Sequence, residues 1–441
     1  MNICEVLDSL IDNELDACNT INMVPSENYA SAISRIPLIL DVYNRYFFNV
    51  NQEKDSWNFR GAQKVSSLES HLAVPLLKEM GKARYVNLRP LSGLNCMALI
   101  LNALSGGPNS NIMLVSPDQG GHYATKDLAE SFGLNVSFIT GHDAHTIDFD
   151  DMIYKLKCQK IKLIYIDQSN CLFPIDIEKL TKVVREVSPE TIIHVDVSHW
   201  MGLVLGEAME NPLEQGADSF GGSTHKTFPG PQKAIFCTNR KDLANLVQEK
   251  QYFMLSSHHF GNVLSLALSL MEFKEKDGRE YAKNIVENSK RLATTLKKFG
   301  FDVKGHSRGF TCGHQIWVST NNVGIDSFIT SEKLSRIGIK VNVFDELPDA
   351  KESILRLGVN EITRFGATLS DMDELAAIMY DCIYENSSIK HLQKRVSSLR
   401  QRYKNAYTYD LTNPEIQTRI EKLLKVVFPS LNLNSRILAP F

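Results

Sequence analysis

The sequence predicts an α/β protein built on a mostly parallel seven-stranded sheet with helices on both faces, followed by a smaller C-terminal α/β domain. Seven short apolar runs lie between residues 85 and 238, and segments with apolar residues at helical spacing separate them. Runs that are apolar along their whole length are typical of strands covered on both faces. The length of 441 residues also favours two or three domains over one.

The elements follow in order along the chain. Apolar residues at helical spacing predict an amphipathic N-terminal helix at 3–19, further helices at 96–104 and 123–132, and one long helical segment at 263–299. Residues 386–425 are rich in Lys, Arg and Gln, which predicts an exposed pair of terminal helices. The strands of the large sheet are expected at 85–88, 112–115, 136–140, 161–166, 192–195, 219–221 and 234–237, and those of the C-terminal region near 303, 315–318, 340–343 and 354–357.

These patterns predict three parts: an N-terminal arm at 1–35, a large domain at 36–300 and a small domain at 301–441. Because ligands of such sheets bind where parallel strands end and loops lead into helices, we expect the functional residues at the carboxyl ends of the strands.

Composition narrows the class of protein. The formal charge is −3, and Lys and Arg cluster only near 394–404, so a nucleic-acid partner is not expected. The eight cysteines show no CxxC spacing, so neither a zinc site nor a disulfide framework is expected, and no metal is predicted. The acidic N-terminus does not resemble a secretion signal, and no apolar run approaches the roughly 20 residues of a membrane helix. A cytoplasmic protein without a membrane partner is the expectation.

The most informative stretch runs from residue 194 to 231. A β-branched strand ends on Asp196, and a lysine, Lys226, follows about thirty residues later among hydroxyl-bearing and small residues. Pyridoxal phosphate chemistry needs this pair, because a lysine holds the cofactor's aldehyde as an imine and a carboxylate keeps the pyridine nitrogen protonated.

Two motifs in this stretch resemble those of serine hydroxymethyltransferases. Asp196, His199, Gly202, Leu203 and Val204 match the family's Asp-x-x-His-x-x-Gly-Leu-Val, and residues 224–231 match Thr-His-Lys-Thr-x-x-Gly-Pro. The resemblance spans roughly residues 20–380. It implies the fold type I of pyridoxal phosphate enzymes, pyridoxal 5'-phosphate bound to Lys226, and a homodimer with shared sites, in which the N-terminal helix embraces the partner subunit.

The resemblance also assigns the residues that bind the cofactor. Ser92 and Gly93 start a helix after a strand, where backbone N–H groups and the helix dipole favour a phosphate, whereas Leu94 replaces a serine of the family. His122 is expected to stack on the pyridine ring and to act in catalysis with Lys226 and Asp196. The other cofactor contacts implied are Ser169, His199, Thr224, His225 and, in a loop contributed by the neighbouring subunit, Ser257.

Three residues are implied to meet the substrate. Arg364 corresponds to the second arginine of the family's Arg-Ile-Gly-Thr-Pro-Ala-Val-Thr-Thr-Arg-Gly and is expected to grip the amino acid's carboxylate, since a guanidinium pairs bidentately with it. Arg356, the first arginine, is expected to form a structural ion pair. Ser26, in a Ser-Glu-Asn turn, and Tyr46, reaching across a dimer interface as a catalytic tyrosine, complete the set.

Departures from the family pattern bear on the reaction. Phe48 stands where the family has the glutamate of proton transfer and folate chemistry, and Phe59 falls in place of tyrosines that help to hold folate. Glu53, in a longer loop, takes over the glutamate's part only if that loop turns inward. His258 and His259 replace part of the phosphate loop and, beside the cofactor, would titrate near neutral pH as acid–base groups.

We therefore predict a pyridoxal phosphate enzyme that makes or breaks the Cα–Cβ bond of glycine, serine or threonine without folate, as an aldolase or as a transaldolase with an aldehyde co-substrate. Three alternatives remain open: folate-dependent hydroxymethyl transfer, Cα deprotonation as in racemases and aminotransferases, and a non-catalytic binding protein.

Overall fold

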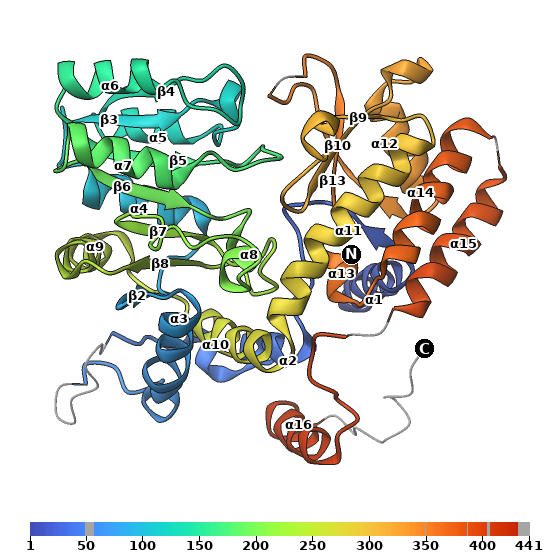
Figure 1. Ribbon diagram of the computed structural model, residues 1–441. Coiled ribbons are helices and arrows are strands. Elements are labelled where there is room, and N and C mark those ends of the chain that lie inside the picture. Colours follow the sequence, from blue (N-terminus) through green and yellow to red (C-terminus); the bar gives the residue numbers. More distant parts are fainter. Residues whose placement is uncertain (49–56, 349, 386, 404–405, 431–441) are drawn as a thin grey trace.

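The computed structural model describes residues 1–48, 57–348, 350–385, 387–403 and 406–430. The large sheet has seven strands in the order β2-β8-β7-β6-β5-β3-β4 (Figure 1). All neighbours pair in parallel except β8, which is antiparallel to both β2 and β7. The strands are β2 (Tyr85–Asn87), β3 (Asn111–Val115), β4 (Asn135–Ile139), β5 (Ile161–Asp167), β6 (Ile192–Asp196), β7 (Ser219–Ser223) and β8 (Ala234–Thr238). The predicted fold class is confirmed.

Successive residues of the strands enter two separate apolar cores, one on each face of the sheet. In β3, Ile112 and Leu114 belong to one core, and Met113 and Val115 belong to the other. This alternation follows from the two-residue period of a strand and explains why the strands read as continuous apolar runs. The first core is covered by α4 (Gly93–Leu104), α5 (Thr125–Ser131) and α9 (Lys241–Met254), and the second by α6 (Phe149–Cys158), α7 (Ile177–Val187), α8 (Met201–Leu205), α10 (Phe260–Glu275) and α11 (Gly278–Lys298).

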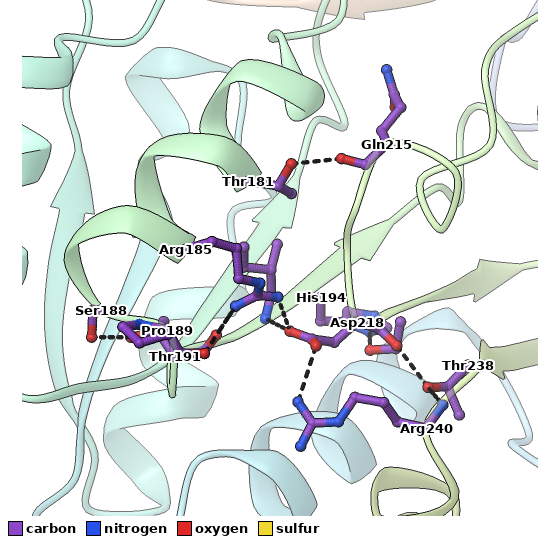
Figure 2. A network of polar contacts seen from close by, with 12 residues as sticks. Thr181, Arg185, Ser188, Pro189, Thr191, His194, Gln215, Asp218, Thr238 and Arg240 are labelled. Atoms are coloured by element: carbon purple, nitrogen blue, oxygen red, sulfur yellow. Dashed lines mark hydrogen bonds and ion pairs between the residues drawn. The ribbon is translucent and has the colours of Figure 1, made fainter.

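The end of the sheet away from the strands' carboxyl termini is fixed by Asp218, which precedes β7. Its carboxylate accepts hydrogen bonds from Arg185 at 2.7 Å, from Arg240 at 3.0 Å and from the main-chain N–H of Ile193 at 2.8 Å (Figure 2). Thr238 donates to the carbonyl of Asp218 at 2.6 Å. One half-buried residue thus joins α7, β6, β7 and β8, and its carboxylate pairs with two arginines.

A second sheet lies in the C-terminal third of the chain (Figure 1). It is antiparallel, in the order β12-β13-β10-β9; α11 and α12 (Ser327–Arg336) pack on it, and α14 (Leu369–Tyr384) packs on these two helices. A short parallel pair, β1 (Ile21–Asn22) with β11 (Ile339–Lys340), connects the N-terminal segment to this region. The strands of the sheet are β9 (Asp302–Val303), β10 (Gln315–Ser319), β12 (Asn342–Phe344) and β13 (Ile354–Gly358).

Two helical predictions are wrong in part. The segment expected as one helix at 263–299 is two helices, because Asp277 adopts the left-handed conformation (φ +52°) and a side chain at Gly278 would collide with Phe273. Of the expected exposed terminal pair, α15 (Ile389–Arg402) buries Leu392, Val396 and Leu399, whereas α16 (Pro414–Val427) buries no residue. Three apolar residues at helical spacing are enough to pack α15 on its neighbours α1 (Ile3–Asn19) and α14.

Candidate active site

The site lies where β5, β6 and β7 end beside the start of α4. Two neighbouring cavities, of about 40 Å³ and about 1020 Å³, have His122, Ser169, His199 and Lys226 in common in their linings. The smaller cavity is also lined by Gly93, Leu94, Met97, Asp167, Gln168, Asp196, Ser198 and Ser223. The sheet therefore delivers these side chains to one place, as expected for the carboxyl edge of parallel strands.

Lys226 is presented by the turn that follows β7. Thr224 closes this turn: its N–H donates to the carbonyl of Lys233 at 3.0 Å, its hydroxyl donates to the carbonyl of Pro231 at 2.7 Å, and its own carbonyl accepts from Gly230 at 2.9 Å. The main-chain carbonyl of Lys226 accepts from the Asn28 amide at 2.5 Å and from the Asn360 amide at 3.3 Å. The peptide of the lysine is thereby fixed by residues far apart in the chain.

The amine of Lys226 is set for nucleophilic chemistry. Desolvation lowers its pKa to about 8; the nearby Asp196 opposes that shift and Arg356 adds to it. Within the described residues its Nζ makes no hydrogen bond or ion pair that would occupy it. At neutral pH an appreciable fraction of the side chain is therefore the free amine that attacks an aldehyde.

Asp196 ends β6 and is held by two donors. Its Oδ1 accepts from the main-chain N–H of Ser198 at 2.8 Å, and its Oδ2 accepts from the buried Tyr165 hydroxyl at 2.9 Å. These bonds fix the carboxylate at the floor of the smaller cavity. Tyr165, two residues before the end of β5, was not identified from the sequence because it reads as one more apolar strand residue.

Two histidines border both cavities as neutral rings. Burial, with a contribution from Lys226, lowers the pKa of His122, whose ring lies 4.5 Å from that of Tyr123 and whose Nδ1 accepts from the N–H of Ala124 at 3.3 Å. Burial likewise lowers the pKa of His199 well below its usual range. The Nδ1 of His199 lies 3.1 Å from Nε2 of His314 and 3.3 Å from the amide nitrogen of Gln315. His199 is therefore held in place by the first residue of β10 and by the residue that precedes this strand.

The start of α4 supplies an anion site next to these groups. Ser92 caps the helix, its hydroxyl accepting from the N–H of Asn95 at 3.2 Å, and Gly93 and Leu94 form the open first turn beside the cavity. A side chain at Gly93 would collide with the hydroxyl of Ser223 and force it to move, so glycine allows the present close approach.

These residues fit pyridoxal phosphate. Lys226 would hold it, Asp196 would meet its ring nitrogen, and the first turn of α4 with Ser92 would hold its phosphate. When bound, the group supplies an electron sink for a bond broken at the substrate's Cα. Among the residues with assigned positions, no three His, Cys, Asp or Glu side chains gather closely enough to hold a metal ion.

The structure brings together only part of the predicted set. Ser26, Gly93, Leu94, His122, Ser169, Asp196, His199 and Lys226 line the cavities, with Ser92 capping the adjacent helix. Thr224 instead serves the turn, and His225 faces a different cavity together with Glu361 and Asn262. Residues alternate in direction along an extended turn, so neighbours of Lys226 in sequence do not all share its cavity.

Arg364 does not lie at the cavity. Its guanidinium is 1% exposed, pairs with Glu272 at 2.5 Å and also donates to the carbonyl of Tyr407. The cavity is lined instead by Arg356, for which a structural ion pair was expected; its hydrogen bonds go to the neutral amides of Asn342, at 3.0 Å, and Asn170. No acidic residue in the described part of the chain forms an ion pair with Arg356, and desolvation lowers its pKa to about 9.

Tyr46 and Ser257 lie outside the cavities of this single chain. Tyr46 is 45% exposed and stacks on Phe48 at 5.7 Å and beside Phe59 at 5.3 Å. Ser257 accepts from the N–H of His259 at 3.3 Å. His258 is buried against Phe47 and Phe260, and His259 is exposed, so neither borders the cavity of its own chain. Glu53 lies outside the described residues.

This is the site of a pyridoxal phosphate-dependent enzyme of fold type I: the fold places Lys226, Asp196 and the anion site at the start of α4 around one cavity. The chain belongs to the serine hydroxymethyltransferase family, whose model matches residues 3–379. The chain is 39% identical to an L-threonine:uridine-5'-aldehyde transaldolase from a Streptomyces species, over 84% of this chain and 87% of that protein. It is 30% identical to a serine hydroxymethyltransferase from Sulfolobus acidocaldarius, over 92% of this chain and 94% of the relative.

Among solved structures, the crystal structure of an L-threonine transaldolase from Pseudomonas fluorescens shares the fold. The TM-score is 0.84 at 24% identity, covering 95% of this chain and 97% of that one. The family and these relatives confirm three predictions: an enzyme, a pyridoxal phosphate cofactor, and aldol chemistry at the Cα–Cβ bond of a small amino acid. None of the helices with assigned positions has the length and apolar character needed to cross a membrane.

Proposed function

We propose that the protein is a folate-independent threonine transaldolase. The Cα–Cβ bond of L-threonine breaks and releases acetaldehyde, and the glycyl fragment joins the carbonyl carbon of a second aldehyde, whose oxygen takes up a proton to become the new β-hydroxyl. The observation that carries this proposal is Phe48 in place of the glutamate that the folate reaction uses, on a chain whose curated relatives at 38–39% identity are named as transaldolases.

In this proposal Arg356 binds the amino acid's carboxylate. It lines the large cavity, its side-chain hydrogen bonds in the described structure go only to neutral amides, and it lies close enough to Lys226 to lower that amine's pKa. A buried guanidinium without a carboxylate partner is poised to take one from a ligand. Anchoring the carboxylate orients the Cα–Cβ bond for cleavage, while neutral His122 accepts or returns the proton of the β-hydroxyl.

The aldehyde co-substrate is proposed to be large, such as a nucleoside 5'-aldehyde of the kind named for the relatives. Threonine would fill only a small part of the cavity of about 1020 Å³. Its outer lining includes Tyr123, Phe344, Asp118 and Lys351, which offer aromatic faces and charged groups to a base and a ribose.

A single assay tests the proposal. The purified protein is incubated with L-threonine and no folate, with and without uridine 5'-aldehyde, and acetaldehyde is followed by its reduction with alcohol dehydrogenase. We expect acetaldehyde release to rise with the acceptor, together with a product whose mass is the sum of glycine and the aldehyde. Activity on serine that requires tetrahydrofolate would contradict the proposal; benzaldehyde in place of the nucleoside aldehyde tests the size of the acceptor.

We further propose that two copies form a homodimer in which Tyr46 and Ser257 complete the partner's site. In support, Tyr46 is exposed, and Ile3, Leu7, Leu10 and Ile11 of α1 are 51–70% exposed. Mixing Lys226→Ala and Tyr46→Phe proteins, each inactive alone, should restore part of the activity, because one of the two sites in the mixed dimer would be intact. No recovery after unfolding and refolding the mixture, with mixed dimers demonstrated, would contradict a shared site. The cytoplasmic location stays a prediction.

A further inference from the structure

A second buried carboxyl group stands beside Asp196. Asp167 ends β5 and pairs in register with Asp196, the last residue of β6. Residues in register on neighbouring parallel strands lie about 5 Å apart and project to the same face of the sheet. Both side chains line the smaller cavity together with Lys226 and His122. Asp167 belongs to no motif in the sequence. It directly follows an apolar run and lies outside the stretches that resemble the family's signatures.

The hydrogen bonds of Asp167 are incomplete. Its Oδ2 accepts from the Thr125 hydroxyl and from the main-chain N–H of His122 at 3.2 Å. Its Oδ1 has no partner in the described structure, although the residue is only 1% exposed. A buried carboxylate oxygen without a partner is strongly disfavoured, whereas a carboxylic acid at the same place offers a proton to whatever enters the cavity.

The surroundings of Asp167 favour its neutral form. The groups that face it are Asp196 on β6, Tyr165 on β5, Thr125 and His122 from the segment after β3 and, across the cavity, Lys226. No arginine or lysine forms an ion pair with it among the described residues. Burial raises the pKa of Asp167 well above its usual range, and the neighbouring Asp196 adds to the shift. Asp196 has a donor on each oxygen, so of the two it is the better placed to keep the negative charge.

We propose that Asp167 is a further cofactor-binding residue, which meets the pyridoxal ring as a neutral acid donating a hydrogen bond from Oδ1. Asp167 and Asp196 then present one hydrogen-bond donor and one negative charge to the ring, in place of two negative charges. This inference rests on the cofactor alone and is independent of which aldehyde the enzyme uses.

Three variants test the inference without measuring turnover. Asp167→Asn keeps the acceptor for Thr125 and His122 and places an amide N–H where the acid proton would be, whereas Asp167→Val removes both. Asp218→Asn is the control, because the Asp218 side chain, which is only 9% exposed, directly precedes β7 of the same sheet but is paired with Arg185 and Arg240 at the far end of that sheet (Figure 2). Each holoprotein is dialysed against graded pyridoxal phosphate, and occupancy is read from the visible absorbance.

We expect Asp167→Asn to bind the cofactor within about threefold of the unmodified protein and Asp167→Val to bind it at least about tenfold more weakly, the ordinary effect of losing one buried hydrogen bond. Equal weakening by both variants would mean that the carboxylate is ionised and would overturn the proposal. Unchanged binding by Asp167→Val would mean that there is no contact and would also overturn it.

Infrared spectroscopy of the holoprotein decides the matter even if Asp167→Val does not fold. A carbonyl band of a protonated carboxylic acid should be present in the unmodified protein and in Asp218→Asn, and should be missing from Asp167→Asn. If no such band distinguishes the unmodified protein from Asp167→Asn, the carboxyl group is ionised and the proposal fails.

Discussion

The guanidinium of Arg364 and the carboxylate of Glu272 form an ion pair of 2.5 Å in which each side chain is only 1% exposed. The pair joins α13 (Asn360–Arg364) to α10, and the other oxygen of Glu272 accepts from the N–H of Tyr409 at 3.0 Å. Arg364 also donates to the carbonyl of Tyr407. The segment before α16 is therefore attached to the body of the protein through this buried pair.

Replacing Arg364 by Met should destabilise the protein rather than impair substrate binding. The variant leaves Glu272 charged and unpaired in the interior, which costs about 3–5 kcal/mol of unfolding free energy. Urea unfolding followed by circular dichroism measures the loss. The double variant Arg364→Met/Glu272→Leu should recover much of it, because no buried charge is left over. If Arg364→Met had unchanged stability and a raised KM for threonine, Arg364 would instead be a substrate-binding residue.

Replacing Arg356 by Met should impair substrate binding more than it destabilises the protein. Losing charge-assisted hydrogen bonds to the substrate carboxylate should raise the KM for threonine roughly 10- to 100-fold, with a smaller effect on stability than Arg364→Met has. Arg356→Lys should recover part of the affinity, since an ammonium keeps the charge but not the planar fork. Steady-state kinetics at saturating aldehyde measure both. A KM that stays within twofold in Arg356→Met would refute this assignment.

Cofactor attachment should depend on pH through Lys226, whose pKa is lowered to about 8. Because only the unprotonated amine attacks the aldehyde, the initial rate of cofactor uptake by the cofactor-free protein should rise about tenfold per pH unit below 8 and level off above it. Absorbance after rapid mixing gives the rate, corrected with a model amine for the titration of free pyridoxal phosphate. A rate that keeps rising to pH 10, as for an exposed lysine, would contradict the shifted pKa.

Removing the Tyr165 hydroxyl should weaken the binding of pyridoxal phosphate. In Tyr165→Phe the Oδ2 of Asp196 loses its donor at 2.9 Å while the ring packing against His194 remains. We expect cofactor affinity to fall about five- to tenfold, in line with a buried acceptor left unsatisfied. The control is Tyr154→Phe, since that tyrosine is 67% exposed on α6. Equal affinities of the two variants would show that the bond does not matter for binding.

The sheet and its chemistry were predictable because the signal is local. Each strand is a short apolar run, and the pair of Asp196 and Lys226 stands at strand ends where the fold type places a ligand. The domain boundaries at 35 and 300 stay predictions. The break at Asp277 was missed because a residue in the left-handed conformation leaves the helical spacing of apolar residues nearly intact on both sides.

The choice between Arg356 and Arg364 could not be made from local sequence. The two arginines are eight positions apart, and what separates them is Glu272, which lies 92 residues upstream of Arg364 and meets it only in the folded protein. The same holds for Asp167 and Tyr165: both contribute polar groups to the site from a strand that reads as apolar, and only the pairing of β5 with β6 shows which carboxyl group they meet.

The hydrogen bonds from Asn28 and Asn360 to the carbonyl of Lys226 join parts of the chain that are synthesised at different times. When the ribosome has added residue 226, every strand up to β7 has been synthesised. Asn360, whose amide binds the carbonyl of Lys226, is then still 134 residues from being added. We therefore expect the cofactor to be bound late in the biogenesis of the protein, because a nascent chain that stops before Asn360 lacks one of the two amides that hold the peptide of Lys226.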